Sequence, residues 1–169
     1  MLAPTLLVGL GGIGSKIVSR VAKRVSEEVP EDLQNRIAYA VFDTDINELQ
    51  EIHQKNPRVT PIQTSTKLTV GEYLNIDEHA REEWFPVNPI LNSKTLTEGA
   101  GQVRAISRLA LETAIRAGKM EPLHQTVESL YKLEQNQAEQ ALRIVVASSL
   151  CGGTGSGLIL PVALYLRNF

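Results

Sequence analysis

Glycine is the residue type whose placement in this sequence points most directly to chemistry. The chain of 169 residues holds twelve glycines, and ten of them fall in three short clusters at residues 9–14, 99–101 and 152–157. Glycine adopts positive φ angles and lets a ligand approach the backbone, at an entropic cost to folding. Three separate clusters therefore predict a binding site assembled from several turns of the chain.

The first cluster, Gly-Leu-Gly-Gly-Ile-Gly, fits the pattern G-x-G-x-x-G. An apolar run at residues 5–9 precedes it and predicts a buried strand, and apolar residues recur with helical spacing from Ile13 onward. Backbone N–H groups at the start of such a helix bind pyrophosphate, and the helix dipole helps them. We therefore expect Gly11, Gly12 and Ile13 to contact nucleotide phosphates, although a turn without a ligand can have the same pattern.

The same residues do not form a P-loop. A P-loop ends in Gly-Lys-Ser/Thr, so that its lysine reaches the β- and γ-phosphates, whereas Ser15 and Lys16 stand here in the opposite order. Lys16 also continues a basic helical face with Arg20 and Lys23, which favours a solvated position over a phosphate contact.

Two carboxylates follow the second apolar run, at residues 37–42. Asp43 lies 29 residues after Gly14, later than the spacing of about 20 at which a dinucleotide fold places its ribose-binding acid. Carboxylates at the end of a strand also suit Mg²⁺, directly or through water. We expect Asp43 to be functional and to hold the metal. For Asp45, a role in the site and a role as N-cap of the next helix are equally favoured.

The third cluster follows another buried apolar run, at residues 142–149. In a doubly wound parallel sheet, the turns after the first and fourth strands flank the reversal in strand order, where ligands bind. Two glycine-rich turns that face one crevice suit a polyphosphate better than one turn does. A Gly155→Val substitution is expected to abolish binding and to leave the chain folded. The second set of expected phosphate-binding residues is Gly152, Gly153, Thr154, Gly155 and Ser156.

These turns need strands and helices to position them. The further elements that we expect are a short edge strand at residues 59–62, which Pro61 interrupts, a helical turn at 77–84, helices at 102–117 and 158–166, and a helix starting near Pro122. Residues 63–98 have weak periodicity and are expected to be a loop-rich excursion. The order of elements predicts an α/β fold with a mainly parallel sheet between helices.

Composition excludes several classes of function. The formal net charge of -2 provides no basic excess for nucleic acid or an anionic membrane surface. The single cysteine cannot form an intramolecular disulfide, and we recognise neither a signal sequence nor an apolar run that could span a bilayer. His53, His79 and His124 form no metal-binding pattern. We therefore expect a cytoplasmic protein without a nucleic-acid partner.

Taken together, the clusters resemble those of the tubulin and FtsZ family. Gly-Gly-Thr-Gly-Ser-Gly after Ser-Leu is similar to the family's signature loop around the phosphates of GTP, although Cys151 stands where the family usually has glycine. Asp43-Thr44-Asp45 resembles the Asn-Thr-Asp of FtsZ. The residues that resemble the family's loop facing the γ-phosphate are Gly99, Ala100, Gly101 and Gln102. The loops occur in the family's order, and the resemblance covers nearly the whole chain.

The resemblance implies a Rossmann-like three-layer α/β fold and a divergent prokaryotic member of the family. Residues 1–169 would be a single nucleotide-binding domain, an incomplete GTPase domain that stops after the fourth strand and its following helix. The implied ligands are GTP or GDP with Mg²⁺, and the implied activity is GTP hydrolysis coupled to head-to-tail self-association of the full-length, cytoskeletal-type protein. The family's water-activating acids lie in a later loop, so this chain alone is expected to be inactive.

Two other functions stay open at this point. An NAD(P)- or FAD-binding Rossmann oxidoreductase would explain the first cluster and Asp43, but it leaves residues 99–101 and 152–157 unexplained. A non-polymerising, nucleotide-sensing adaptor would keep the same loops and would have lost assembly or turnover.

Overall fold

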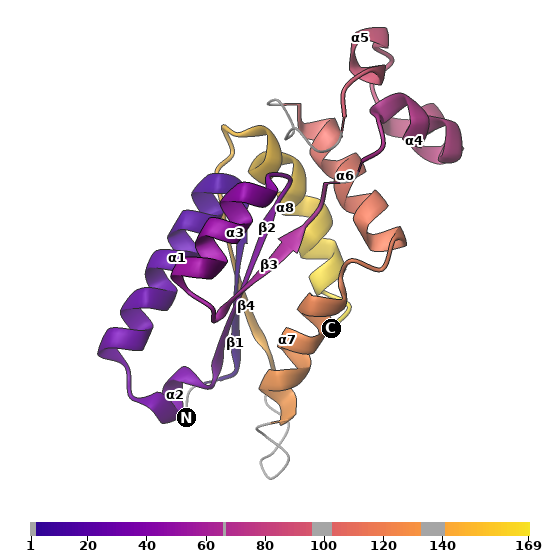
Figure 1. The fold of residues 1–169 in the computed structure, drawn as a ribbon. Coiled ribbons are helices and arrows are strands. Elements are labelled where there is room, and N and C mark those ends of the chain that lie inside the picture. The colour runs from indigo at the N-terminus through magenta and orange to yellow at the C-terminus, as the bar shows by residue number, and fades with distance from the viewer. Residues whose placement is uncertain (1–2, 66, 96–102, 133–140) are drawn as a thin grey trace.

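A four-stranded, fully parallel sheet forms the centre of the molecule (Figure 1). The computed structural model describes residues 3–65, 67–95, 103–132 and 141–169. The strands lie in the order β3-β2-β1-β4. β2 and β3 are added on one side of β1 and β4 on the other, so the strand order reverses between β1 and β4. This topology confirms the expected α/β fold. The strands are β1 (Thr5–Leu10), β2 (Ile37–Asp43), β3 (Val59–Gln63) and β4 (Arg143–Ser148).

Helices cover both faces of the sheet, as its apolar strands require. On one face α1 (Gly11–Glu28) packs on β1, β2 and β4, and α3 (Ile46–Lys55) packs on β2 and β3. On the other face α7 (Glu121–Lys132) packs on β2 and β3, and α8 (Gly153–Leu166) packs on β1 and β4. A short helix, α2 (Glu31–Gln34), lies between α1 and β2.

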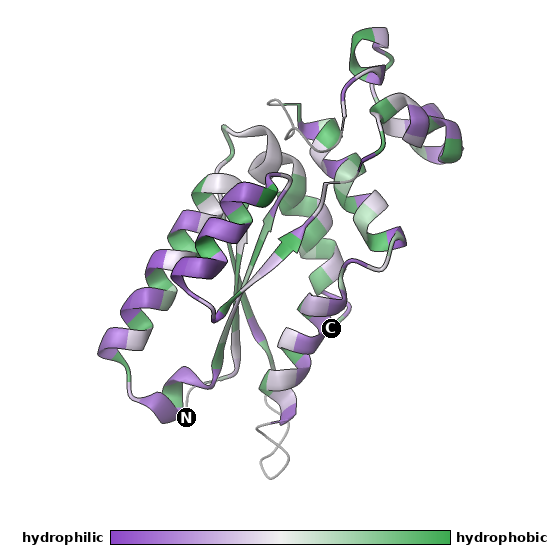
Figure 2. Ribbon diagram, viewed as in Figure 1, coloured by the Kyte–Doolittle hydropathy of each residue, from purple (hydrophilic) through white to green (hydrophobic). Residues whose placement is uncertain are grey.

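Alternate residues of each strand enter two separate hydrophobic clusters. Leu6, Val8 and Phe42 pack with the apolar residues of α7 and α8, whereas Tyr39 and Val41 pack with those of α1 and α3. Burying one such side chain contributes about 1.5–3 kcal/mol. Figure 2 shows hydrophobic and hydrophilic residues interspersed along α1, α3 and α7, as expected for helices with one buried face. These two clusters fix the positions of the strand ends from which the glycine-rich segments start.

The two edges of the sheet differ. β3 lies at one edge and contains Pro61, which confirms the expected short edge strand, because proline cannot donate a hydrogen bond to a further strand. β4 lies at the other edge and pairs with β1 along its whole length, from Thr5↔Arg143 to Leu10↔Ser148. In the described part of the chain, no helix has the length and hydropathy to cross a membrane.

Residues 67–95 fold into short helices, although a loop-rich segment was expected. They are α4 (Val70–Ile76), a π-helical turn η1 (Ala80–Trp84) and α5 (Pro89–Asn92). Thr69 and Glu72 form a capping box that starts α4, and this Thr-x-x-Glu pattern was readable in the sequence. The expected helical turn at 77–84 corresponds to η1. We call residues 67–95 the α4–α5 excursion; Figure 1 shows it projecting beyond one end of the sheet.

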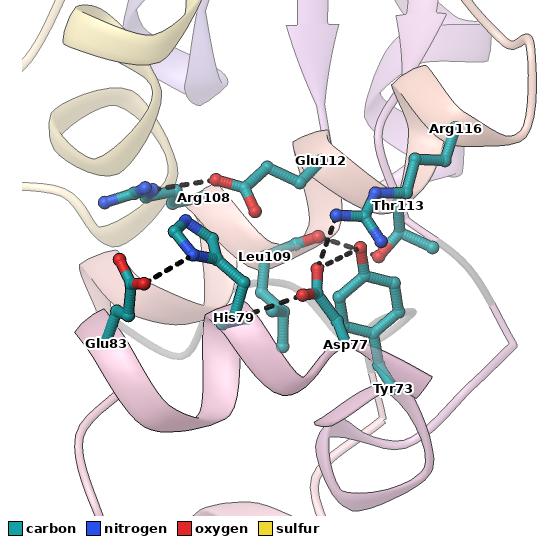
Figure 3. A network of polar contacts seen from close by, with 10 residues as sticks. Tyr73, Asp77, His79, Glu83, Arg108, Leu109, Glu112, Thr113 and Arg116 are labelled. Carbon is teal, nitrogen blue, oxygen red and sulfur yellow. Dashed lines mark hydrogen bonds and ion pairs between the residues drawn. The ribbon is translucent and has the colours of Figure 1, made fainter. Parts of the chain in front are cut away.

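The α4–α5 excursion packs on α6 (Arg104–Arg116) through a hydrophobic cluster of its own. Tyr73, Phe85 and Leu91 of the excursion pack with Ile106 and Leu109 of α6. Polar contacts add to this packing, as Figure 3 shows for the region between α4, η1 and α6. Gly118 has a φ of 70° just after α6, as expected for a helix C-cap.

Two helices begin earlier than the sequence predicted. α1 begins at Gly11 rather than Ile13, and α8 begins at Gly153 rather than Leu158. Most glycines of the first and third clusters therefore lie in the first turns of helices and not in loops. Glycine has a low helix propensity, but close packing against neighbouring backbone stabilises these turns and overrides that local preference.

Candidate functional site

The N-termini of α1 and α8 meet at one surface hollow of about 220 Å³, which we call the α1–α8 hollow. Because β1 and β4 are neighbours with Leu10 opposite Ser148, the helices that follow them begin side by side. This arrangement confirms that the first and third glycine clusters flank the reversal in strand order. The hollow is lined by Leu10, Gly11, Gly12, Ile13, Lys16, Ser149, Gly152, Gly153, Thr154 and Gly155.

Several of these glycines are required by close packing between segments of the protein itself. Gly11 has a φ of 69°, and a Cβ there would lie 2.8 Å from the backbone N of Gly155. A Cβ at Gly155 would lie 2.8 Å from the carbonyl O of Leu10 and 2.6 Å from Oγ of Ser148. A Cβ at Gly14 would overlap the carbonyl O of Ala147. These glycines bring the two helix N-termini together rather than leaving room for a ligand.

Gly12 and Gly152 are different, since both line the hollow and neither is packed against backbone. The three atoms nearest to a Cβ at Gly12 all belong to the carboxyl group of Glu48, a flexible side chain. A Cβ at Gly152 would have no described atom within 4 Å. Gly152 also has φ -88° and ψ 158°, an extended conformation that any residue adopts. At these two positions, close packing of the protein's own backbone does not require glycine.

Neither helix N-terminus at the hollow has a side-chain cap. Within the described residues, Leu10 and Gly152 make no side-chain capping bond, and the first turns of α1 and α8 contain no acidic residue. By contrast, Asp45 caps α3 and Thr69 caps α4. The first N–H groups of a helix have no partner within the helix and carry a partial positive charge. Two such N-termini side by side therefore form a favourable place for an anion.

Two cationic side chains lie beside this place. Lys16 lines the hollow, although its sequence context favoured a solvated face; it is exposed and also borders the groove between α1 and α3. The position of Lys16, one helical turn after Gly12, is the signal that could have identified it. Arg104 of α6 donates from Nη2 to the carbonyl O of Leu150, at 3.3 Å, next to Ser149.

α6 is attached to the start of α8 by close contacts. Oγ of Ser107 donates to the carbonyl O of Gly153, at 3.0 Å, and a Cβ at Gly157 would overlap the carbonyl O of Arg104. The helix expected over residues 102–117 thus packs against the hollow's edge. The four expected γ-phosphate contacts lie outside the described residues: Gly99, Ala100, Gly101 and Gln102.

Asp43 lies at the end of β2 with its side chain 5% exposed. Its Oδ1 accepts hydrogen bonds from the backbone N of Thr44 at 2.7 Å and of Asp45 at 3.2 Å. Burial raises the pKa of the Asp43 carboxyl above its ordinary value, the two N–H donors oppose this shift, and the charges of Glu48 and Asp45 add to it. Asp43 shapes the turn between β2 and α3, and it does not line the hollow.

Asp45 is the N-cap of α3. Its Oδ1 accepts from the backbone N of Asn47 at 2.8 Å and of Glu48 at 3.4 Å. The capping interpretation, which the sequence left open, is thereby confirmed. Asp45 is exposed and, like Asp43, is absent from the hollow's lining.

The turn before α8 and the start of that helix carry polar side chains, of which the sequence interpretation did not assign Ser149 to the site. Ser149 lines the hollow, and its Oγ accepts from the backbone N of Cys151 at 3.2 Å. Oγ of Ser156 donates back to the carbonyl O of Gly152, so this hydroxyl is used within the first turn of α8. Cys151 is exposed rather than packed beneath the turn, because the chain passes over the surface before α8 begins.

Comparison with known proteins agrees with this fold. A search of curated proteins found no match. A sequence model of the family described as "Tubulin like" matches residues 6–169, which is nearly the whole chain and reaches all four strands of the described sheet. The chain therefore belongs to the tubulin-like family.

Proposed function

We propose that this protein binds the phosphates of GTP or GDP in the α1–α8 hollow. The observation that carries the proposal is the pair of uncapped helix N-termini that open side by side into the hollow. Their backbone N–H groups suit the oxygens of a diphosphate or triphosphate, and the two helix dipoles add to the attraction. The choice of guanine rests on membership of the tubulin-like family.

In this proposal the backbone, and not the side chains, makes most of the phosphate contacts. Gly12 and Ile13 contribute N–H groups from α1, and Gly153, Thr154 and Gly155 contribute them from α8. Lys16 adds a positive charge from the side of the hollow. The backbone N–H of Ser156 has a helical acceptor in the carbonyl O of Gly152, so we keep the hydroxyl of Ser156, which now bonds to the same oxygen, as its proposed phosphate contact. We keep Gly99, Ala100, Gly101 and Gln102 as proposed contacts for the terminal phosphate.

Mg²⁺ fits this arrangement as a companion of the phosphates, supplying charge neutralisation when bound. The described residues hold no group of three or more His, Cys, Asp or Glu side chains that could hold a metal by themselves. Phosphate oxygens and water must therefore supply most of its ligands, which is common for Mg²⁺. Asp43 is our proposed protein ligand, directly or through water, because its carboxylate ends β2 beside the first turn of α3.

GTP hydrolysis coupled to head-to-tail self-association is the further part of the proposal. None of the residues that line the hollow in the described chain is acidic, so the hollow itself offers no carboxylate to activate a water molecule. An acid from a neighbouring subunit would supply that group in a head-to-tail assembly. The tubulin-like family supports self-association in general terms.

Calorimetric titration with GTP, GDP, ATP and NAD, each with and without Mg²⁺, tests the proposal. We expect the guanine nucleotides to bind most tightly, and Gly12→Val and Gly152→Val each to weaken binding by at least about tenfold by placing a branched side chain beside the backbone N–H groups at the hollow. Ala163→Val is the control, because it places the same valine side chain at an exposed position on α8 far along the helix. Tighter binding of NAD than of every guanine nucleotide would refute the proposal, as would unchanged GTP affinity in both glycine variants.

A further inference from the structure

Glu48 holds a carboxylate against the edge of the α1–α8 hollow. It lies in the first turn of α3, and its Oε2 is 2.9 Å from the position that a Cβ of Gly12 would occupy. Gly12 lines the hollow and belongs to the first turn of α1. A negatively charged group therefore stands beside one of the two N-termini that favour an anion.

The local sequence explains why this carboxylate is turned toward α1. Asp45-x-x-Glu48 is a capping-box pattern, like Thr69-x-x-Glu72, in which Glu72 accepts from the backbone N of Thr69 at 2.7 Å. In α3 the corresponding backbone N, that of Asp45, donates to Asp43 instead. Glu48 therefore does not close a capping box, and its carboxyl group lies next to Gly12.

The groups around Glu48 come from three elements. Asp43 of β2 is near enough for the charge of Glu48 to raise its pKa. On α1, Lys16 and Arg20 border the same groove as Glu48. On α3, Glu51 is one turn further along and pairs with Lys55.

We propose that Glu48 makes phosphate binding depend on a divalent cation. The proposal rests on the function proposed above, in which a phosphate lies at the first turn of α1. Without a cation, the carboxylate of Glu48 repels that phosphate across a short distance at the edge of the protein, where screening by water is incomplete. With a divalent cation, the phosphate and the carboxylate both face a positive charge, and the repulsion becomes attraction.

The experiment compares the whole chain with Glu48→Gln, which keeps the shape of the side chain and removes its charge. GDP and inorganic pyrophosphate are titrated by calorimetry, once with EDTA and once with excess Mg²⁺. For wild type we expect both ligands to bind about tenfold or more weakly in EDTA. For Glu48→Gln we expect binding in EDTA to tighten by about tenfold and the effect of Mg²⁺ to shrink accordingly.

Glu51→Gln is the matched control, since it removes the same charge from the same helix without touching Gly12. It should retain the wild-type dependence on Mg²⁺. Glu48→Lys should bind pyrophosphate in EDTA more tightly than Glu48→Gln does. Thermal unfolding checks that each variant is folded. One outcome would overturn the role of Glu48 and leave the proposed function intact. In that outcome wild type binds GDP with Mg²⁺, but Glu48→Gln binds GDP in EDTA no more tightly than wild type does. Absence of guanine-nucleotide binding by wild type under both conditions would refute the proposed function and this inference together.

Discussion

Asp77 and Arg116 join the α4–α5 excursion to α6 through an ion pair, with Nη2 of Arg116 2.8 Å from Oδ2 of Asp77 (Figure 3). The side chain of Asp77 is only 3% exposed, whereas that of Arg116 is 56% exposed. Asp77 also accepts hydrogen bonds from the backbone N of Ala80 at 3.0 Å and from the hydroxyl of Tyr73 at 3.2 Å. One buried carboxyl thus connects α4, η1 and α6.

Replacing Asp77 by alanine should destabilise the excursion strongly. The change leaves the N–H of Ala80 and the hydroxyl of Tyr73 without their acceptor in a buried position, which costs about 2–4 kcal/mol. Arg116→Ala should cost less, about 0.5–1 kcal/mol, because the guanidinium is largely solvated. Urea unfolding followed by the fluorescence of Trp84 measures both effects, since this single tryptophan lies in η1. Glu78→Ala, at an exposed neighbouring acid, is the control. A similar loss of unfolding free energy in Glu78→Ala would show that Asp77 does not connect these helices in the way described.

The same carboxyl should make stability depend on acid. The N–H of Ala80 is the largest cause that holds the pKa of Asp77 below its ordinary value of 3.8, and Arg116 and the hydroxyl of Tyr73 act in the same direction. A depressed pKa means that the unfolded chain binds the proton more readily, so the stabilisation is present above pH 3.8 and is lost as the pH falls through the lower, folded-state value. The difference in unfolding free energy between wild type and Asp77→Asn should therefore shrink below pH 3.8. A difference that stayed constant down to pH 2 would contradict this assignment.

The structure changes what should follow from Gly155→Val. The sequence led us to expect a folded chain without nucleotide binding, but a side chain at Gly155 would overlap the backbone of Leu10 and Oγ of Ser148. We now expect the variant to lose about 1–3 kcal/mol of stability through overpacking. Gly152→Val should retain wild-type stability, because no described atom lies near its Cβ. Paired chemical denaturation of the two variants decides the matter, and equal stabilities would show that the turn relaxes around the added atoms.

Lys16→Ala should weaken nucleotide binding without affecting the fold. Lys16 lines the hollow and is exposed, so its loss removes a favourable charge near the phosphates and little packing. A charge-assisted contact of this kind is worth about 1.5–3 kcal/mol, or roughly tenfold or more in affinity. Lys23→Ala is the control, since Lys23 lies further along α1 and pairs with Glu27 at 3.8 Å. Equal GDP affinities in the two variants would show that Lys16 belongs to a solvated helical face and does not contact the phosphates.

Phosphate release from GTP should be undetectable at low protein concentration. The reason is that none of the described residues lining the hollow is acidic, and we assign Glu48, at the edge of the hollow, to the divalent cation and not to the attacking water. In the full-length protein, where a neighbouring subunit would supply the acid, activity per molecule should rise with protein concentration, whereas residues 1–169 alone should stay inactive at every concentration. Activity that is proportional to concentration and lost in Asp43→Ala would instead show that one chain carries the whole catalytic group.

The sequence by itself determined the strand-turn-helix units and their family. Apolar runs ending at Leu10 and Ser148, followed by glycine clusters and helical spacing, are local patterns, and local patterns can be read without the fold. The rule for doubly wound sheets then predicted that the two clusters would meet, and the neighbouring positions of β1 and β4 confirm it.

Only the tertiary structure decided what each residue does within those units. Gly11 and Gly155 read as loop residues by propensity, yet they form helical turns, in which Gly11 packs against the backbone of Gly155 and Gly155 packs against the backbone of Leu10. Glu48 lies beside Gly12 because Asp43 occupies the N–H that a capping box would have used. Such choices depend on which backbone segments the sheet brings within a few ångströms of each other, and no spacing along the chain encodes that distance.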